Sequence, residues 1–312
     1  MKRNKVKRAR HFFSTSIIIC LIIGLLAGCG NADKDTGSAG AGSGCSSSAG
    51  DTIESSQAAN KKDGKWVESE YATYGENGQM TGRGTYEYDG KGELIHITRY
   101  NADGSLGIEQ EWLSPDAHGN YTVMKSYSGG ALDLVITYTY REDGEKVASD
   151  IEERPNEETV KSEYNWSADD SQVMISKYGA SGSPTGYLSK TYDSEGRLTL
   201  YINYSYSDSD VYKTSYTYTD NQTVEVDWIE VAQMPTGGIT SIVTNKDDQG
   251  RDGETLIYCT TDQSPYTEEN LTQRIVYDYE TDKHSHKKTI YNAAGKITGT
   301  YVGTDIFLPG VE

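Results

Sequence analysis

Large and polar side chains alternate along most of residues 66–303, with a period of two. Tyrosine fills many of the large positions, since the chain has 25 tyrosines and all of them follow residue 70. Examples of the alternation are Tyr86-Glu87-Tyr88, Tyr138-Thr139-Tyr140, Tyr204-Ser205-Tyr206, Tyr216-Thr217-Tyr218 and Tyr277-Asp278-Tyr279. A period of two puts both rings of a pair on one face of a β-strand. The pattern predicts an all-β body, and no segment shows helical periodicity with caps.

A turn motif, Tyr-x-x-x-Gly-x-apolar, separates the predicted strands. Clean copies begin at Tyr74, Tyr88, Tyr100, Tyr192 and Tyr291. Asp or Asn often follows the tyrosine, and either residue suits the first position of a type I turn. The glycine suits the positive-φ position that joins such a turn to the returning strand. Each copy therefore predicts the corner of a β-hairpin, and we expect Gly196 to have a positive φ.

The corners recur at steps of 12 to 14 residues, or about twice that, between positions 74 and 218. One strand plus one tight turn has this length. Consecutive tight turns predict a long antiparallel meander of hairpin repeats. Because aliphatic residues are too few for a thick two-layer core, we expect a single extended sheet, curved or loosely rolled.

The N-terminus has the parts of an export signal. Its first eleven residues carry six basic side chains and no acid, an apolar run follows at 17–26, and Ala27 and Gly28 precede Cys29. The stretch Leu26-Ala27-Gly28-Cys29 resembles the bacterial lipobox. That resemblance implies cleavage before Cys29 and attachment of lipid to its thiol. An uncleaved anchor helix is the alternative, and either one holds the body outside the cytoplasmic membrane.

Three regions follow from this interpretation: a signal peptide at 1–28, a lipidated and Gly/Ser-rich flexible tether at 29–63, and a β-repeat domain at 64–312. The whole chain has a net charge of −18. Removal of the six basic residues of the signal makes the mature charge −24. This charge argues against nucleic acid as a partner. Cys45 and Cys259 are left as cysteines that could pair or stay separate.

The repeats resemble two known families. Tyr192-Asp193-Ser194-Glu195-Gly196-Arg197-Leu198-Thr199 resembles the YD repeat of Rhs-type cell-surface proteins, in which β-sheet is wrapped into a shell. The segment from Tyr74 to Gly90 resembles MORN-type hairpins, which imply single-sheet scaffolds for protein or lipid contacts. At this chain length we expect no closed shell, and no toxin domain is evident.

The search for catalytic chemistry finds no metal-protease, P-loop, nucleophile-elbow or paired CxxC motif. We therefore predict no catalytic residue, no cofactor and no enzyme activity. His284 and His286 are weak candidates for a metal site, because they would share one strand face near Glu280 and Asp282. The alternative is a polar hairpin tip.

A ligand site is suggested by aromatic residues near the start of the body. The segment from Asp63 to Gly82 resembles one unit of the choline- or glucan-binding cell-wall repeats, which makes Trp66, Tyr71 and Tyr74 weak candidates for ligand contact. The alternative is that these rings, with Trp112, Trp166 and Trp228, pair across strands and hold the sheet together.

The sequence as a whole predicts a surface-anchored lipoprotein that acts as a non-enzymatic binding or scaffold module. One alternative is a cell-wall polysaccharide-binding module that uses its aromatic residues. Another is a hydrolase whose carboxylates the sequence does not identify. The expected partners are membrane lipid, through Cys29, and a wall glycan or another envelope protein.

Overall fold

The computed structural model describes residues 64–206, 211–231, 234–235, 239–260, 268–280 and 284–309. All of these residues belong to one compact unit, Glu54–Glu312. The predicted signal, tether, Cys29 and Cys45 lie outside these ranges. Within them, no helix is long and apolar enough to span a membrane.

Most of the described chain is β-strand, and turns join the strands. The elements are β1 (Gly64–Gly75), β2 (Met80–Tyr88), β3 (Leu94–Asn101), β4 (Leu106–Pro115), β5 (Tyr121–Ser128), β6 (Ala131–Tyr140), β7 (Val147–Glu153), β8 (Val160–Trp166), β9 (Gln172–Tyr178), β10 (Pro184–Tyr192), β11 (Leu198–Ser205), β12 (Val211–Tyr218), β13 (Gln222–Val231), β14 (Met234–Pro235), β15 (Ile239–Lys246), β16 (Asp252–Thr260), the 3₁₀ turn η2 (Glu268–Asn270), β17 (Leu271–Glu280), β18 (Ser285–Asn292) and β19 (Ile297–Pro309).

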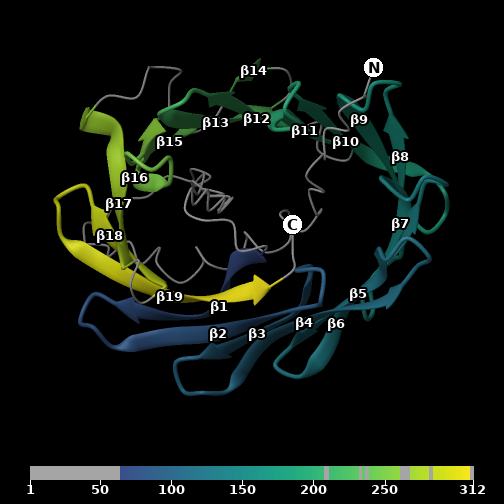
Figure 1. Cartoon of the computed structure of the whole chain (residues 1–312). Coiled ribbons are helices and arrows are strands. Elements are labelled where there is room, and N and C mark those ends of the chain that lie inside the picture. Colours follow the sequence, from purple (N-terminus) through teal and green to yellow (C-terminus); the bar gives the residue numbers. More distant parts are fainter. Residues whose placement is uncertain are drawn as a thin grey trace, which may run out of the picture. The chain divides into compact units, whose positions relative to one another are not determined.

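Apart from the two-residue β14, the strands form a closed antiparallel barrel of 18 strands, drawn as a ring in Figure 1. Each strand pairs with its neighbours in sequence, except that β13 pairs directly with β15 past the short β14. The ring closes where β1 pairs with β19, from Gly64 opposite Pro309 to Gly75 opposite Gly299. The prediction of an open curved sheet or loose roll is therefore wrong, and so is the expectation that the chain is too short for a closed shell.

Closure has a plain physical cause, which is the pairing of the two sheet edges. An open sheet leaves a row of unpaired N–H and C=O groups along each terminal strand. Here the two terminal strands satisfy each other over their whole length. The scarcity of aliphatic residues argued against a two-layer core. A closed single sheet needs no second layer, because the inward side chains of all its strands point into one interior.

The inner face carries the core. Along β3 to β6 and β9, its residues include the side chains that are fully buried, Ile97, Leu134 and Val173. Trp112 lies opposite Met124, which lies opposite Ile136, so that one apolar row crosses β4, β5 and β6. The same face continues around the barrel with buried aliphatic side chains such as Ile175 and Ile242. Half-buried tyrosines lie among them, such as Tyr164, whose ring covers the sheet while its hydroxyl donates to Asp150.

The outer face carries charges in the middle of strands, beside exposed apolar side chains such as Ile151 and Met174. Lys161 Nζ lies 2.7 Å from Glu163 Oε1 on β8. Arg274 Nε on β17 lies 2.5 Å from Glu254 Oε1 on β16. Exposed pairs of this kind contribute little to stability, roughly 0–1 kcal/mol each. They do identify this face as one that is in contact with water.

The hairpin corners have the geometry that the turn motif predicts. At Asp193, the backbone N–H of Gly196 donates to the Asp193 carbonyl at 3.0 Å. The Asp193 carboxylate accepts from the backbone N–H groups of Glu195 and Arg197, both at 2.9 Å. Gly196 has a φ of +83°, which confirms the expected positive value.

Replacing Gly196 with valine should lower the free energy of unfolding by about 1–3 kcal/mol, because a β-branched residue is strained at positive φ. No atom lies within 4 Å of a Cβ built at Gly196, so the cost is one of backbone strain alone. The control is Gly90→Val, since Gly90 also has open space but no positive φ. Urea denaturation should separate the two variants, and equal midpoints would contradict the turn assignment.

Candidate functional site

The closing seam, formed by β19 and β1 with the flanking β18, β2 and β3, gathers most of the residues that the sequence suggested. Trp66, Tyr71 and Tyr74 lie on β1, and His286 lies on β18. His284 comes just before β18 and its carbonyl accepts from the Asp305 N–H at 2.7 Å. The seam joins strands more than 200 residues apart, as the Ser69-to-Thr304 hydrogen bond shows with a separation of 235.

The inner side of the seam holds a buried polar cluster around Glu68. The Tyr301 hydroxyl donates to Glu68 Oε1 at 2.5 Å. His286 Nε2 lies 3.2 Å from the same oxygen, and these side chains are 6% (His286) and 12% (Glu68) exposed. The direction of the His286 contact is unsuitable for a hydrogen bond, so Nε2 is a buried nitrogen without one. Its Nδ1 faces Asp305 Oδ1 at 3.7 Å.

Aromatic rings enclose this cluster. Tyr71 stacks on Tyr301 with 5.1 Å between ring centroids and 11° between planes. Tyr86 lies 5.7 Å from Tyr71. Two glycines make the arrangement possible: a Cβ at Gly84 would be 2.5 Å from the Tyr71 ring, and one at Gly303 would be 2.5 Å from the His286 ring. The cluster therefore depends on glycine, which has no side chain, beneath the rings of Tyr71 and His286.

Burial sets the protonation of the seam tyrosines. Burial, and then the nearby Glu68, raises the pKa of Tyr301 and of Tyr86. Burial also raises the pKa of Asp305. The two phenols therefore stay protonated, and the Tyr301 hydroxyl is a hydrogen-bond donor. Its bond to Glu68 joins β19 to β1, and the His286 ring of β18 packs beside both side chains.

The two histidines proposed as a metal pair have different surroundings. His284 has a φ of +49° and lies outside the strand. Its ring stacks on Trp66 with 3.6 Å between centroids. His286 points into the cluster around Glu68. In the described part of the chain, no three side chains of the metal-binding types lie close enough together to hold an ion.

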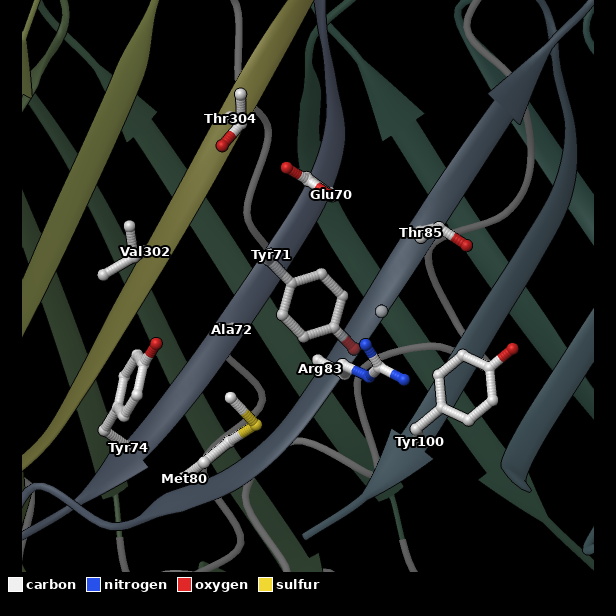
Figure 2. A pocket seen from close by; sticks show the side chains of 11 residues that line it. Glu70, Tyr71, Ala72, Tyr74, Met80, Arg83, Thr85, Tyr100, Val302 and Thr304 are labelled. Atoms are coloured by element: carbon white, nitrogen blue, oxygen red, sulfur yellow. The ribbon is translucent and has the colours of Figure 1, made fainter. Parts of the chain in front are cut away.

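The outer side of the seam is a shallow groove, shown in Figure 2. Strands of the opposite wall lie behind β1 and β2 in this view, so the side chains that point toward the viewer, such as those of Tyr100 and Met80, are on the outer face. The groove is lined by Glu70, Tyr71, Ala72, Tyr74, Met80, Arg83, Gly84, Thr85, Tyr100, Val302 and Thr304.

Apolar and polar groups alternate within this groove. Met80 is 43% exposed and Val302 is 36% exposed, so apolar side chains are open to solvent here, as they are at Ile151 and Met174 elsewhere on the outer face. The Arg83 guanidinium carbon lies 5.0 Å from the Tyr100 ring centroid, a cation–π contact that fixes the ring. The groove therefore offers two phenol rings, Tyr74 and Tyr100, between hydrogen-bonding side chains.

Sequence reasoning pointed to part of this groove and missed the rest. It named Tyr74, and it named Tyr71, whose ring lies on the inner side and reaches the groove beneath Gly84. It missed Arg83 and Tyr100, although Tyr100 begins a clean turn motif. Their alignment, Arg83 opposite Tyr100, follows from the β2–β3 register, which the hairpin spacing could have supplied.

Comparisons with known proteins place the chain in no family. No family model matches it, and no curated protein matches it. Among solved structures, a porin-like protein from Bacteroides uniformis is similar over 77% of this chain and 96% of its own, with 9% identity and a TM-score of 0.37.

Two further structures contain TcdB2–TccC3. The complex with Cdc42 is similar over 77% of this chain and 16% of that chain, with 13% identity and a TM-score of 0.26. The form without the hypervariable C-terminal region is similar over 75% of this chain and 14% of that chain, with 12% identity and a TM-score of 0.28. This chain therefore spans only a small part of those two chains. At these TM-scores, none of the three likenesses carries a functional argument.

Proposed function

We propose that this protein is a lipid-anchored, extracytoplasmic β-barrel that binds cell-wall polysaccharide through the outer groove of the closing seam and has no enzyme activity. The observation that carries the proposal is the groove itself, where the half-buried rings of Tyr74 and Tyr100 lie among hydrogen-bonding groups.

The chemistry of the groove suits a sugar. The two faces of a pyranose ring are largely C–H, and an amphipathic phenol can cover such a face while its hydroxyl stays hydrated. Glu70, Thr85 and Thr304 supply acceptors and donors for sugar hydroxyls beside these rings. The strongly acidic mature chain is repelled by anionic polymers, so a neutral glycan is the favoured ligand.

A binding role is favoured over hydrolysis by the acidic content of the groove. Glycoside hydrolysis uses two carboxylates on either side of the scissile bond. Among the described residues that line the groove, Glu70 is the one carboxylate. The hydrolase alternative therefore has no acid pair at this position.

The test is a binding assay with purified cell-wall polysaccharide, using the full chain. Tyr74→Ala and Tyr100→Ala should each weaken binding by roughly tenfold, which corresponds to about 1.4 kcal/mol for a lost aromatic contact. Tyr127→Ala is the matched control, because Tyr127 is an outer-face tyrosine on β5 that bonds Glu111 and lies outside the groove. Equal binding by all three variants would contradict the proposal.

A further inference from the structure

A second group of side chains lies on the inner face of β13, away from the seam. Glu225 and Asp227 are two residues apart on this strand and share that face. Glu225 is only 8% exposed. It lies opposite Tyr216 of β12 and Ile242 of β15, while Asp227 lies opposite Thr214 and Thr240.

Neither carboxylate has a cationic partner within the described residues. Asp227 Oδ1 accepts from the Thr214 hydroxyl at 2.5 Å. Its other oxygen, Oδ2, is buried and has no hydrogen bond. For Glu225 the described chain contains no hydrogen bond, and its electrostatic neighbours include Asp227, Tyr216 and Tyr218. Burying unpaired carboxylates is costly, so this pair is unfavourable as a purely structural feature.

Burial raises the pKa of both carboxyl groups. Burial, and then the charge of Asp227, raises the pKa of Glu225 to about 9. Burial also raises the pKa of Asp227. The titratable side chains on the same face nearby include Tyr212, Tyr216 and Tyr218 of β12, Tyr201 of β11 and Lys190 of β10. Cys259 of β16, opposite Thr240, is disulfide-bonded and does not titrate.

The surroundings favour an organic cation over a metal ion. Tyr216 and Tyr218 are stacked 6.5 Å apart at 10°, and a cation is attracted to the face of such rings. A primary ammonium has three N–H donors, which match the Glu225 carboxylate, the Asp227 oxygen that has no hydrogen bond, and one ring face. A divalent metal needs more oxygen ligands than Glu225, Asp227 and the Thr214 hydroxyl provide.

We propose that the inner face of β12, β13 and β15 binds a primary ammonium ion, with Glu225 and Asp227 accepting its N–H groups beside the Tyr216 ring. Binding displaces the proton of the Glu225 carboxyl, which passes to the buffer. The ligand class is a small alkylamine or the amino group of a larger molecule. This site is separate from the outer groove and does not depend on the glycan proposal.

The experiment is isothermal titration of the full chain at pH 7 with n-butylammonium chloride and, separately, with calcium chloride. The ammonium should bind one per chain, with a heat that changes with the ionisation enthalpy of the buffer because a proton is released. Glu225→Gln and Asp227→Asn should each weaken binding by roughly tenfold or more. Glu163→Gln, on the outer face, is the control and should bind like the wild type.

Folding does not obscure this test. Glu225→Gln removes a buried carboxyl without changing its size, so its melting temperature should equal or exceed that of the wild type. Three results would overturn the proposal: no saturable binding of the ammonium, unchanged binding in both variants, or calcium binding that is tighter than ammonium binding and lost in Glu225→Gln.

Discussion

Gly84→Ala should lower the free energy of unfolding by about 2–3 kcal/mol, as an added methyl group does in a packed interior that cannot expand. A Cβ at this position would lie 2.5 Å from Tyr71 Cε1 and 2.8 Å from the Thr98 carbonyl oxygen. The ring could move only by losing its stack on Tyr301, and the carbonyl belongs to the β2–β3 ladder. The added methyl group would therefore disturb either the ring stack or the strand pairing.

Gly82→Ala is the matched control for this experiment. Gly82 lies on the same strand and the same face, two residues away. Its Cβ would meet the Tyr100 carbonyl oxygen at 3.1 Å and the Thr73 hydroxyl at 3.3 Å, which small shifts relieve. We expect a loss below about 1 kcal/mol in urea denaturation. Similar losses for both variants would show that the packing of Tyr71 over Gly84 does not stabilise the barrel.

Cys29→Ala should abolish lipid attachment. In a bacterium fed a labelled fatty acid, the wild type should incorporate the label and sediment with membranes. The variant should incorporate none, because the lipobox resemblance implies that the lipid is attached to the Cys29 sulfur. The expected change is a complete loss of label.

The control for this experiment is Cys45→Ala, which removes a thiol from the same predicted tether and should leave labelling unchanged. A labelled Cys29→Ala variant would contradict the proposed anchor. Label lost equally from both variants would show that the attachment does not depend on the lipobox position.

The local structure was predictable because it is determined by a few consecutive residues. The Asp193 carboxylate, the positive φ of Gly196 and the return to a strand at Leu198 all lie within one turn. Similar turns follow Tyr88, Tyr100 and Tyr291. Antiparallel pairing of consecutive strands follows directly from turns this short.

Closure was not predictable from the same signals. It depends on the pairing of β1 with β19, which no turn connects. The specific contacts of this pairing, such as Tyr71 on Tyr301 and Glu68 with His286, join residues at opposite ends of the body. Because tyrosines are spread along the whole chain, their alternation does not indicate which two edges meet.

The candidate sites depend on this closure to different degrees. The outer groove needs Val302 and Thr304 of β19 beside Tyr74 of β1, so it exists only in the closed barrel. A repeat resemblance indicated Tyr74, but nothing in the sequence indicated the residues of β19 that lie beside it. Glu225 and Asp227 lie within one strand, but their missing counter-charge is visible only when the facing strands are known.

Chemical cross-linking across the seam tests the closed barrel most directly. Glu70 is exposed on β1 and lies between two partners, Thr304 of β19 and Thr85 of β2. We would treat Glu70→Cys/Thr304→Cys and Glu70→Cys/Thr85→Cys with a short bis-maleimide and identify the joined tryptic peptides by mass. The closed barrel predicts efficient cross-linking of both pairs. Cross-linking of the 70–85 hairpin pair without the 70–304 pair would show that β1 and β19 do not meet, and would contradict the barrel.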